Sequence, residues 1–145
     1  MKDGLLYARY DAKKGKQPPE GAIPCQDPDP ITGHWPHWVR ATRPEDVWLR
    51  EAFSNSLGKS PVEDGTYEAV GPKINGNPEG FTRHVLIKHE GDYNTIPIWE
   101  ATFHTLSQLL GINSIEGYVF HHNDGVRKCK VKRTDFGLGW PIPKE

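Results

Sequence analysis

The sequence has little cysteine, no long apolar run and almost no net charge, and each of these lacks excludes a class of protein. Its two cysteines, Cys25 and Cys129, are too few for a disulfide framework, so we expect free thiols in a reducing, intracellular compartment. No apolar run reaches the ~18 residues of a membrane span, and the N-terminus lacks the apolar run of a signal peptide. We therefore expect a cytoplasmic protein without a membrane partner. A net charge of −1 excludes binding of nucleic acid through bulk charge.

The composition is that of one folded domain over residues 1–145. Fifteen glycines and thirteen prolines make the chain rich in loops, but below the content of a disordered segment. Five residues each of Trp, Tyr and Phe supply a hydrophobic core.

The apolar pattern predicts an α+β domain with antiparallel strands. One helix begins at Pro44 and ends before Gly58, and a second follows a stripe from Ile98 to Leu110 and ends at Gly111. The stretch 11–46, with seven prolines, is expected to be a long irregular loop. Strands are predicted over 4–10, 65–71, 84–90, 115–122 and 126–134, the last two joined by an Asn-Asp-Gly turn.

Half of the basic residues lie in two clusters: Arg9, Lys13, Lys14 and Lys16, and Arg127, Lys128, Lys130, Lys132 and Arg133. In the second cluster, strand alternation places Lys128, Lys130 and Lys132 on one face and Cys129 with Val131 on the other. Ammonium groups about 7 Å apart repel one another unless an anion or carboxylates lie among them. The cluster therefore indicates either a solvated face that protects an edge strand or, with Glu116, a site for a metal-bound phosphate.

Several runs in this order resemble the covalent nucleotidyltransferases, which comprise DNA ligases, RNA ligases and capping enzymes. EGYVF (116–120) and KVK (130–132) resemble their motifs IV and V, and DGTYE (64–68) resembles motif III. Longer runs are similar to one branch of ATP-dependent RNA ligases: 6–16, 21–39, 65–80 and 130–141. The resemblance covers nearly the whole chain and implies the antiparallel-sheet adenylation domain of the nucleic-acid ligases.

One motif of that family is missing. Family members are adenylated on the lysine of K-x-D-G, but the sequence offers only Lys2-Asp3-Gly4, without the intervening residue. The Asp3-Gly4 turn instead resembles the hairpin that follows this motif. Truncation at the N-terminus is the interpretation we favour, while a lysine from another chain or loss of the first reaction step stay open.

The resemblance implies the chemistry of an RNA ligase. A lysine attacks ATP, AMP passes to an RNA 5′-phosphate, and a 3′-hydroxyl displaces it, with Mg²⁺ or Mn²⁺ as cofactor. Lys130 and Lys132 would contact the α-phosphate, and Glu116 would bind the metal. Glu68 would contact the ribose or the metal shell, and Arg9 the 5′-phosphate or the nucleotide phosphates.

The resemblance also implies a role for the basic residues after the first strand, and two other functions compete with that of an RNA ligase. Lys13, Lys14 and Lys16 would lie along the RNA backbone, where each contact adds salt-dependent affinity. A non-catalytic fragment that binds nucleotide and RNA, and a capping-type guanylyltransferase, are the competing functions. The Trp-rich run from His34 to Trp38 is expected to pack on the core rather than bind zinc or a base.

Overall fold

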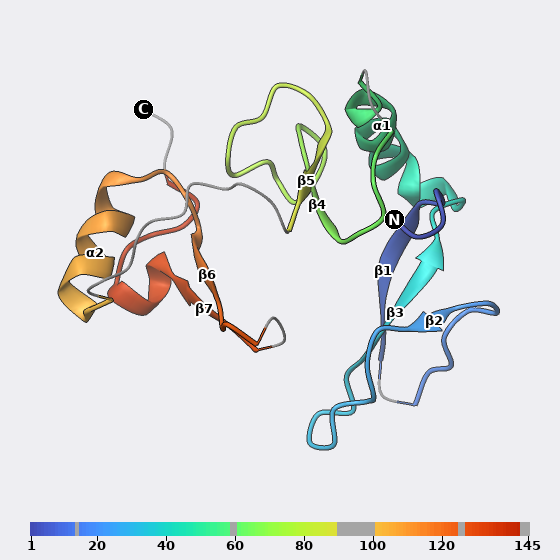
Figure 1. Ribbon diagram of the computed structural model, residues 1–145, viewed down its shortest axis with the longest axis horizontal. Coiled ribbons are helices and arrows are strands. Elements are labelled where there is room, and N and C mark those ends of the chain that lie inside the picture. Colours follow the sequence, from blue (N-terminus) through green and yellow to red (C-terminus); the bar gives the residue numbers. More distant parts are fainter. Residues whose placement is uncertain (14, 59–60, 90–100, 125–126, 143–145) are drawn as a thin grey trace. The chain divides into compact units, whose positions relative to one another are not determined.

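The computed structural model describes residues 1–13, 15–58, 61–89, 101–124 and 127–142 (Figure 1). These form two compact units, which are considered separately. The N-terminal unit comprises Met1–Asn77 and Phe81–Gly91, and the C-terminal unit comprises Pro78–Gly80 and Asp92–Glu145. All strand pairs in the described ranges are antiparallel, as the sequence predicts.

The N-terminal unit contains two small sheets and one helix. In the first sheet, β3 (Trp35–Arg40) lies between β1 (Tyr7–Ala12) and β2 (Ile23–Pro24). The second sheet pairs β4 (Tyr67–Val70) with β5 (Val85–Lys88). Helix α1 (Val47–Ser56) follows the short 3₁₀ helix η1 (Pro44–Asp46) and packs against β5 and β4.

The prediction of an irregular stretch over 11–46 is wrong at β3, at β2 and at the last two residues of β1. The six residues of β3 pair with β1, from Tyr7 opposite Arg40 to Ala12 opposite Trp35. The prolines around it conceal a strand that long-range pairing stabilises, because local propensity is a weak guide to sheet formation. The pairing of β3 with β1 creates a sheet face that carries Tyr7 and Arg9 from β1 and Trp38 from β3.

A buried histidine, His84, holds α1 and the loop after β4 together. Its ring stacks on Trp48, with centroids 5.0 Å apart, and its Nδ1 lies 3.0 Å from Glu51 Oε1. Its Nε2 accepts a hydrogen bond from the Lys73 backbone N–H at 3.1 Å. The proton of the neutral ring must therefore be on Nδ1, where it donates to Glu51.

The C-terminal unit contains a helix and a hairpin, and the helix contacts the 3₁₀ helix that follows the hairpin. It contains α2 (Phe103–Ile112), β6 (Gly117–His121), β7 (Lys128–Lys132) and the 3₁₀ helix η2 (Arg133–Phe136). Thr102 caps α2, since its Oγ1 accepts from the Thr105 N–H at 3.1 Å. No helix in the described ranges has both the length and the apolar character needed to cross a membrane.

The predicted end of the second helix at Gly111 is wrong by a short distance. Gly111 lies inside α2, and Asn113 is the C-cap. The backbone N–H and the side-chain amide of Asn113 both donate to Leu109 O, at 3.1 and 2.8 Å. A side-chain cap therefore ends the helix in place of a glycine. Ile98, the first residue of the predicted stripe, lies outside the described residues.

Candidate functional site

The hairpin of β6 and β7 confirms the predicted arrangement of the basic strand. Lys132 lies opposite Gly117, Lys130 opposite Val119, and Lys128 opposite His121. Directly opposed residues share a face of the sheet, so the three lysines lie on one face. Cys129 and Val131 lie on the other face, as predicted.

Glu116 joins this lysine face from the residue before β6. Its Oε1 lies 3.1 Å from Lys130 Nζ and 3.7 Å from Lys132 Nζ. The structure thus brings together three of the predicted site residues, and we refer to Glu116, Lys130 and Lys132 as the hairpin cluster. Two cations and one carboxylate leave it with a net positive charge, which suits a phosphate.

The ion pairs of the hairpin cluster are open to solvent. The side chains of Glu116 and Lys130 are 38% and 42% exposed. Ion pairs with this exposure contribute about 0–1 kcal/mol of stability. A phosphate or a metal ion could therefore displace one member of the pair at little cost, although the same geometry is also that of a surface ion-pair network.

Two apolar positions shape the surface around the lysines. A side chain at Gly117 would overlap the backbone carbonyl of Val131, so glycine allows the close approach of the two strands. Val119, opposite Lys130, is 52% exposed and offers an apolar contact within a charged face.

The carboxylates of the described residues could supply only part of the ligands of a Mg²⁺ ion. No group of three or more His, Cys, Asp or Glu side chains in the described ranges is arranged to hold a metal ion. Mg²⁺ commonly takes one or two protein carboxylates and completes its shell with water and substrate phosphates. Glu116 fits that requirement as a single, partly exposed oxygen ligand.

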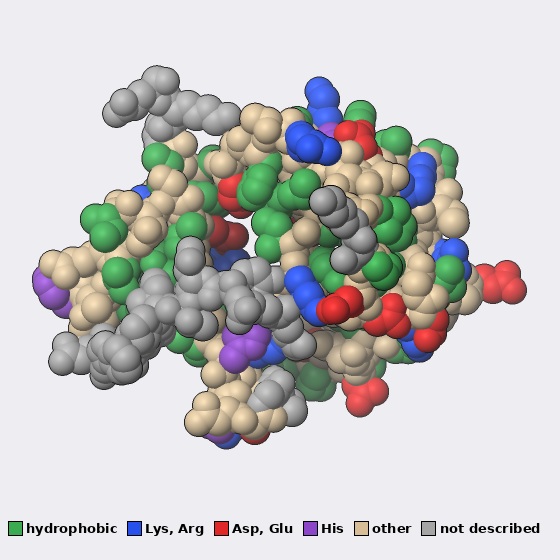
Figure 2. All heavy atoms as spheres, turned by 45° about the horizontal axis from the view of Figure 1, so that its top comes forward, with side chains coloured by type: hydrophobic (Ala, Val, Ile, Leu, Met, Phe, Trp, Pro, Cys, Tyr) green, Lys and Arg blue, Asp and Glu red, His purple; other side chains and the backbone are tan. Residues whose placement is uncertain are grey.

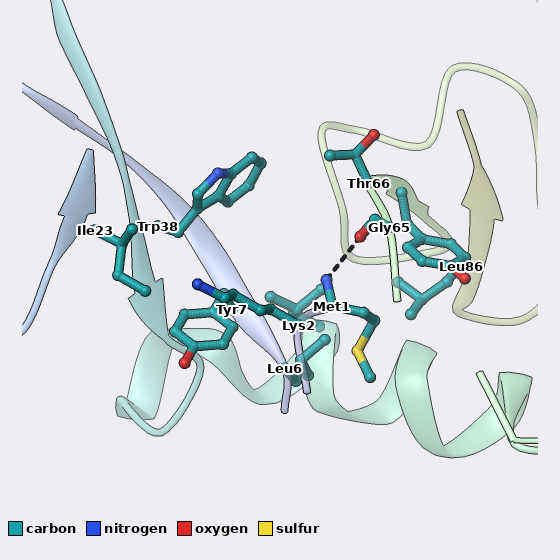
Figure 3. Close-up of a pocket in the computed structure, with 11 residues that line it drawn as sticks. Met1, Lys2, Leu6, Tyr7, Ile23, Trp38, Gly65, Thr66 and Leu86 are labelled. Atoms are coloured by element: carbon teal, nitrogen blue, oxygen red, sulfur yellow. Dashed lines mark hydrogen bonds between the residues drawn. The ribbon is translucent and has the colours of Figure 1, made fainter. Parts of the chain in front are cut away.

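A second candidate site is a pocket inside the N-terminal unit (Figure 3), with a volume of about 260 Å³. Its walls come from both sheets and from α1, and its lining is mainly apolar and aromatic. The side chains that line it include Lys2, Tyr7, Ile23, Trp38, Leu49, Tyr67 and Leu86. Aromatic walls of this kind suit a flat ring such as a nucleobase.

The pocket face of the first sheet also carries Arg9. This residue lies opposite Trp38 in the register and shares a face with Tyr7. Its Nε donates to Asp11 Oδ1 at 3.0 Å, and its side chain is 57% exposed. The predicted phosphate ligand therefore lies next to an aromatic residue of the pocket.

Cations of the pocket face are accompanied by aromatic rings and carboxylates. The Arg40 guanidinium lies over the Tyr7 ring, 5.5 Å from its centroid.

The positive charge of Arg9 also acts on a nearby cysteine. Burial raises the pKa of the Cys25 thiol, and the Arg9 charge partly opposes this increase. On the face of the molecule displayed in Figure 2, basic and acidic side chains both appear among the described residues.

Glu68 lies away from the pocket. It follows Tyr67 on β4, so the two side chains point to opposite faces, and Tyr67 is the one that lines the pocket. The Glu68 carboxylate is 3.7 Å from His89 Nε2, and its side chain is 58% exposed. Its predicted contact with the ribose or the metal shell stays a prediction.

The predicted RNA-contacting lysines follow β1. Lys13 and Lys16 are exposed, and the Lys16 N–H donates to Lys13 O at 2.8 Å in a turn. Lys14 lies outside the described residues. Exposure leaves Lys13 and Lys16 available to a phosphate backbone.

Sequence reasoning missed most of the pocket and one buried cation. The pocket residues come from positions 1 to 86, and no local pattern connects them. Arg133, counted above in a basic cluster, is 7% exposed. Its side chain donates to backbone carbonyl groups of Leu110, Asn113 and Gly139, so it is part of the interior.

Part of the chain is similar in sequence to known proteins. Over 108 residues it is 37% identical to the protein named RNA ligase 1 of Pongo abelii, and 33% identical to RNA ligase 1 of Rattus norvegicus. This similarity indicates an RNA ligase-related family. The alignments cover 69% of this chain, which spans about a third (32%) of the length of these relatives. No family model matches it.

This relationship confirms part of the sequence-based interpretation. The resemblance to an RNA ligase family is confirmed over the aligned portion. The superfamily, the use of ATP and metal, and the roles of individual residues stay predictions.

Proposed function

We propose that the chain is the adenylation region of an ATP-dependent RNA ligase, which joins RNA 5′-phosphate and 3′-hydroxyl ends. The observation that carries this proposal is the hairpin cluster, in which the carboxylate of Glu116, directly before β6, lies within 3.7 Å of two lysine amines on the adjacent strand β7. Relatives named RNA ligase 1 support the ligase over a capping-type guanylyltransferase.

The joining step uses the hairpin cluster as a preorganised cation site. The 3′-hydroxyl oxygen forms a bond to the 5′-phosphorus of an adenylated RNA, and the bond from that phosphorus to the AMP oxygen breaks. The hydroxyl proton passes to water, and AMP leaves with the charge of the broken bond. Lys130 and Lys132 stabilise this charge as it develops, because fixed cations need no reorganisation during reaction.

Metal and nucleotide base would be held by other residues. Glu116 would bind Mg²⁺ or Mn²⁺, which withdraws charge from phosphate oxygens when bound. The aromatic pocket around Tyr7 and Trp38 would take a base, and the neighbouring Arg9 would contact a phosphate. Lys13 and Lys16 would add contacts along the RNA backbone.

Joining of pre-adenylated RNA tests this function without the missing K-x-D-G lysine. The full chain is incubated with a 5′-adenylated RNA, a 3′-hydroxyl RNA and Mg²⁺ in the absence of ATP. We expect a joined product and released AMP, because the RNA already carries the activated phosphate.

The same assay separates the competing functions. A chain that binds adenylated RNA but joins none of it would be the non-catalytic binding fragment. Joining that the Glu116→Gln variant retains in full would show that the hairpin cluster is a surface ion-pair network, and would overturn the assignment of the site.

A further inference from the structure

A buried arginine lies directly after the strand of the hairpin cluster. Arg133 follows Lys132 in sequence and is 7% exposed. Its Nε donates to Gly139 O at 2.9 Å, and its Nη1 donates to Asn113 O at 3.0 Å and to Leu110 O. No carboxylate in the described part of the chain lies within ion-pair distance of its guanidinium.

The charge of Arg133 is balanced by the end of a helix. Leu110 lies in the last turn of α2 and Asn113 is its C-cap, where carbonyl groups lack partners within the helix. These carbonyls form the negative end of the helix dipole, which favours a cation. A buried charge is costly unless hydrogen bonds satisfy it, so the Arg133 fork is held to one position by three carbonyls.

The backbone of the same residue holds Glu116. The Arg133 N–H donates to Glu116 O at 2.9 Å. Residue 133 therefore connects the hairpin cluster with the end of α2, through its N–H on one side and its guanidinium on the other. The Lys132 N–H is fixed as well, because it donates to Asp135 Oδ2 at 2.7 Å in the first turn of η2.

We propose that Arg133 is a positioning residue, whose anchored guanidinium fixes Lys132 and Glu116 at the separation required for phosphate chemistry. The inference rests on the proposed function for its kinetic consequence. Its structural part, the placement of Lys132 beside Glu116, does not depend on that function. Displacement of a reacting group by about 1 Å can cost roughly 10²-fold in rate, so loss of the anchor should reduce turnover.

The test compares Arg133→Gln with Arg127→Gln. Both changes remove one positive charge, but Arg127 is exposed beyond the other end of β7 and pairs with Asp124. Arg133→Lys retains the charge and loses the planar fork. All measurements are made at a temperature at which circular dichroism shows each variant to be folded.

The first readout is the NMR signal of the lysine side chains and needs no activity. Glu116→Gln defines the ¹³Cε–¹Hε shifts of Lys132 without its carboxylate partner. We expect Arg133→Gln to move the Lys132 signal toward that position, Arg133→Lys to move it less, and Arg127→Gln to leave it in place. An unchanged Lys132 signal in Arg133→Gln would overturn the proposal.

The second readout is the joining of pre-adenylated RNA. We expect kcat to fall roughly 10-fold or more in Arg133→Gln with KM within about 3-fold, and Arg133→Lys to recover part of the loss. An increase in KM with an unchanged kcat would contradict a positioning role. If the parent chain joins no RNA, the proposed function fails and the NMR result alone decides. If neither Arg133 variant folds, Arg133 serves the stability of the unit as a whole and the proposal is wrong.

Discussion

Lys130 Nζ lies 3.1 Å from Glu116 Oε1, although Glu116 precedes β6 and Lys130 is in the middle of β7. Both groups are partly exposed, so the contact adds little stability. In the proposed function the contact holds the Lys130 charge in position for a phosphate. Experiments can measure this effect on the reaction separately from the effect on stability.

The two lysines of the hairpin cluster should be required for joining but not for folding. We expect Lys130→Ala or Lys132→Ala to slow joining of pre-adenylated RNA by roughly 10²-fold or more, because each removes a preorganised cation. The unfolding free energy should change by at most about 0.5 kcal/mol, as for surface substitutions. Single-turnover rates and urea denaturation measure the two effects.

Cys129→Ser is the matched control for the lysine variants. Cys129 lies next to Lys130 on β7 and faces the opposite side of the hairpin. We expect its joining rate to stay within about 2-fold of the parent, since it loses no charge on the lysine face. Parent rates in both lysine variants would show that the strand is not the equivalent of motif V.

Two glycines of the C-terminal unit should respond to alanine with opposite signs. The methyl group of Gly117→Ala would overlap Val131 O, so the hairpin must shift, at a cost of about 1–3 kcal/mol. Gly111 lies in α2 with no atom near its Cβ position, and Gly111→Ala should add about 0.5–1 kcal/mol through helix propensity. Urea denaturation measures both, and destabilisation by Gly111→Ala would contradict this packing.

The carboxylate of Asp64, which binds the turn before β1, should make the stability of the protein depend on pH. Asp64 accepts from the backbone N–H of Gly4 at 3.1 Å and of Asp3 at 2.6 Å, and these bonds hold the pKa of its carboxyl below the ordinary value. The contribution is therefore complete above the ordinary pKa of about 3.9 and is lost as pH falls through the lower folded value.

Asp64→Asn should lower the urea midpoint at neutral pH, and the gap to the parent should close as the pH falls below about 3.9. Asp27→Asn removes an equal charge at an exposed position of the same unit. A gap that persists in acid, or an equal effect of Asp27→Asn, would assign the loss to something other than the ionised Asp64 carboxylate.

The chain itself should not form a covalent adenylate. The 145 residues contain no K-x-D-G, although Lys2 lines the pocket of the N-terminal unit. Intact mass spectrometry after incubation with ATP and Mg²⁺ should show the unmodified mass. An acid-labile AMP adduct that maps to Lys2, and is lost in Lys2→Arg, would contradict this prediction and identify Lys2 as the nucleophile.

The sequence predicts what is encoded by near neighbours and misses what distant segments build. The β6–β7 hairpin follows from strand alternation and an Asn-Asp-Gly turn, so its lysine face was predictable. β3 was not, because its pairing with β1 spans a proline-rich stretch. Arg133 resembles any residue of a basic run, and only the carbonyls of Leu110, Asn113 and Gly139 reveal that it is buried.

The two candidate sites also differ in how soon they would form during folding. The lysine face needs the closure of β6 on β7, and hairpins form in about 1–10 μs, while the proposed anchor of the hairpin cluster adds only the contacts of Arg133 with the end of α2. The aromatic pocket needs Tyr7, Trp38 and Leu86 together, and contacts this distant in sequence slow folding. When a complete chain refolds from denaturant, the lysine face would therefore form while the N-terminal unit is still searching for its native contacts, and the aromatic pocket would form later.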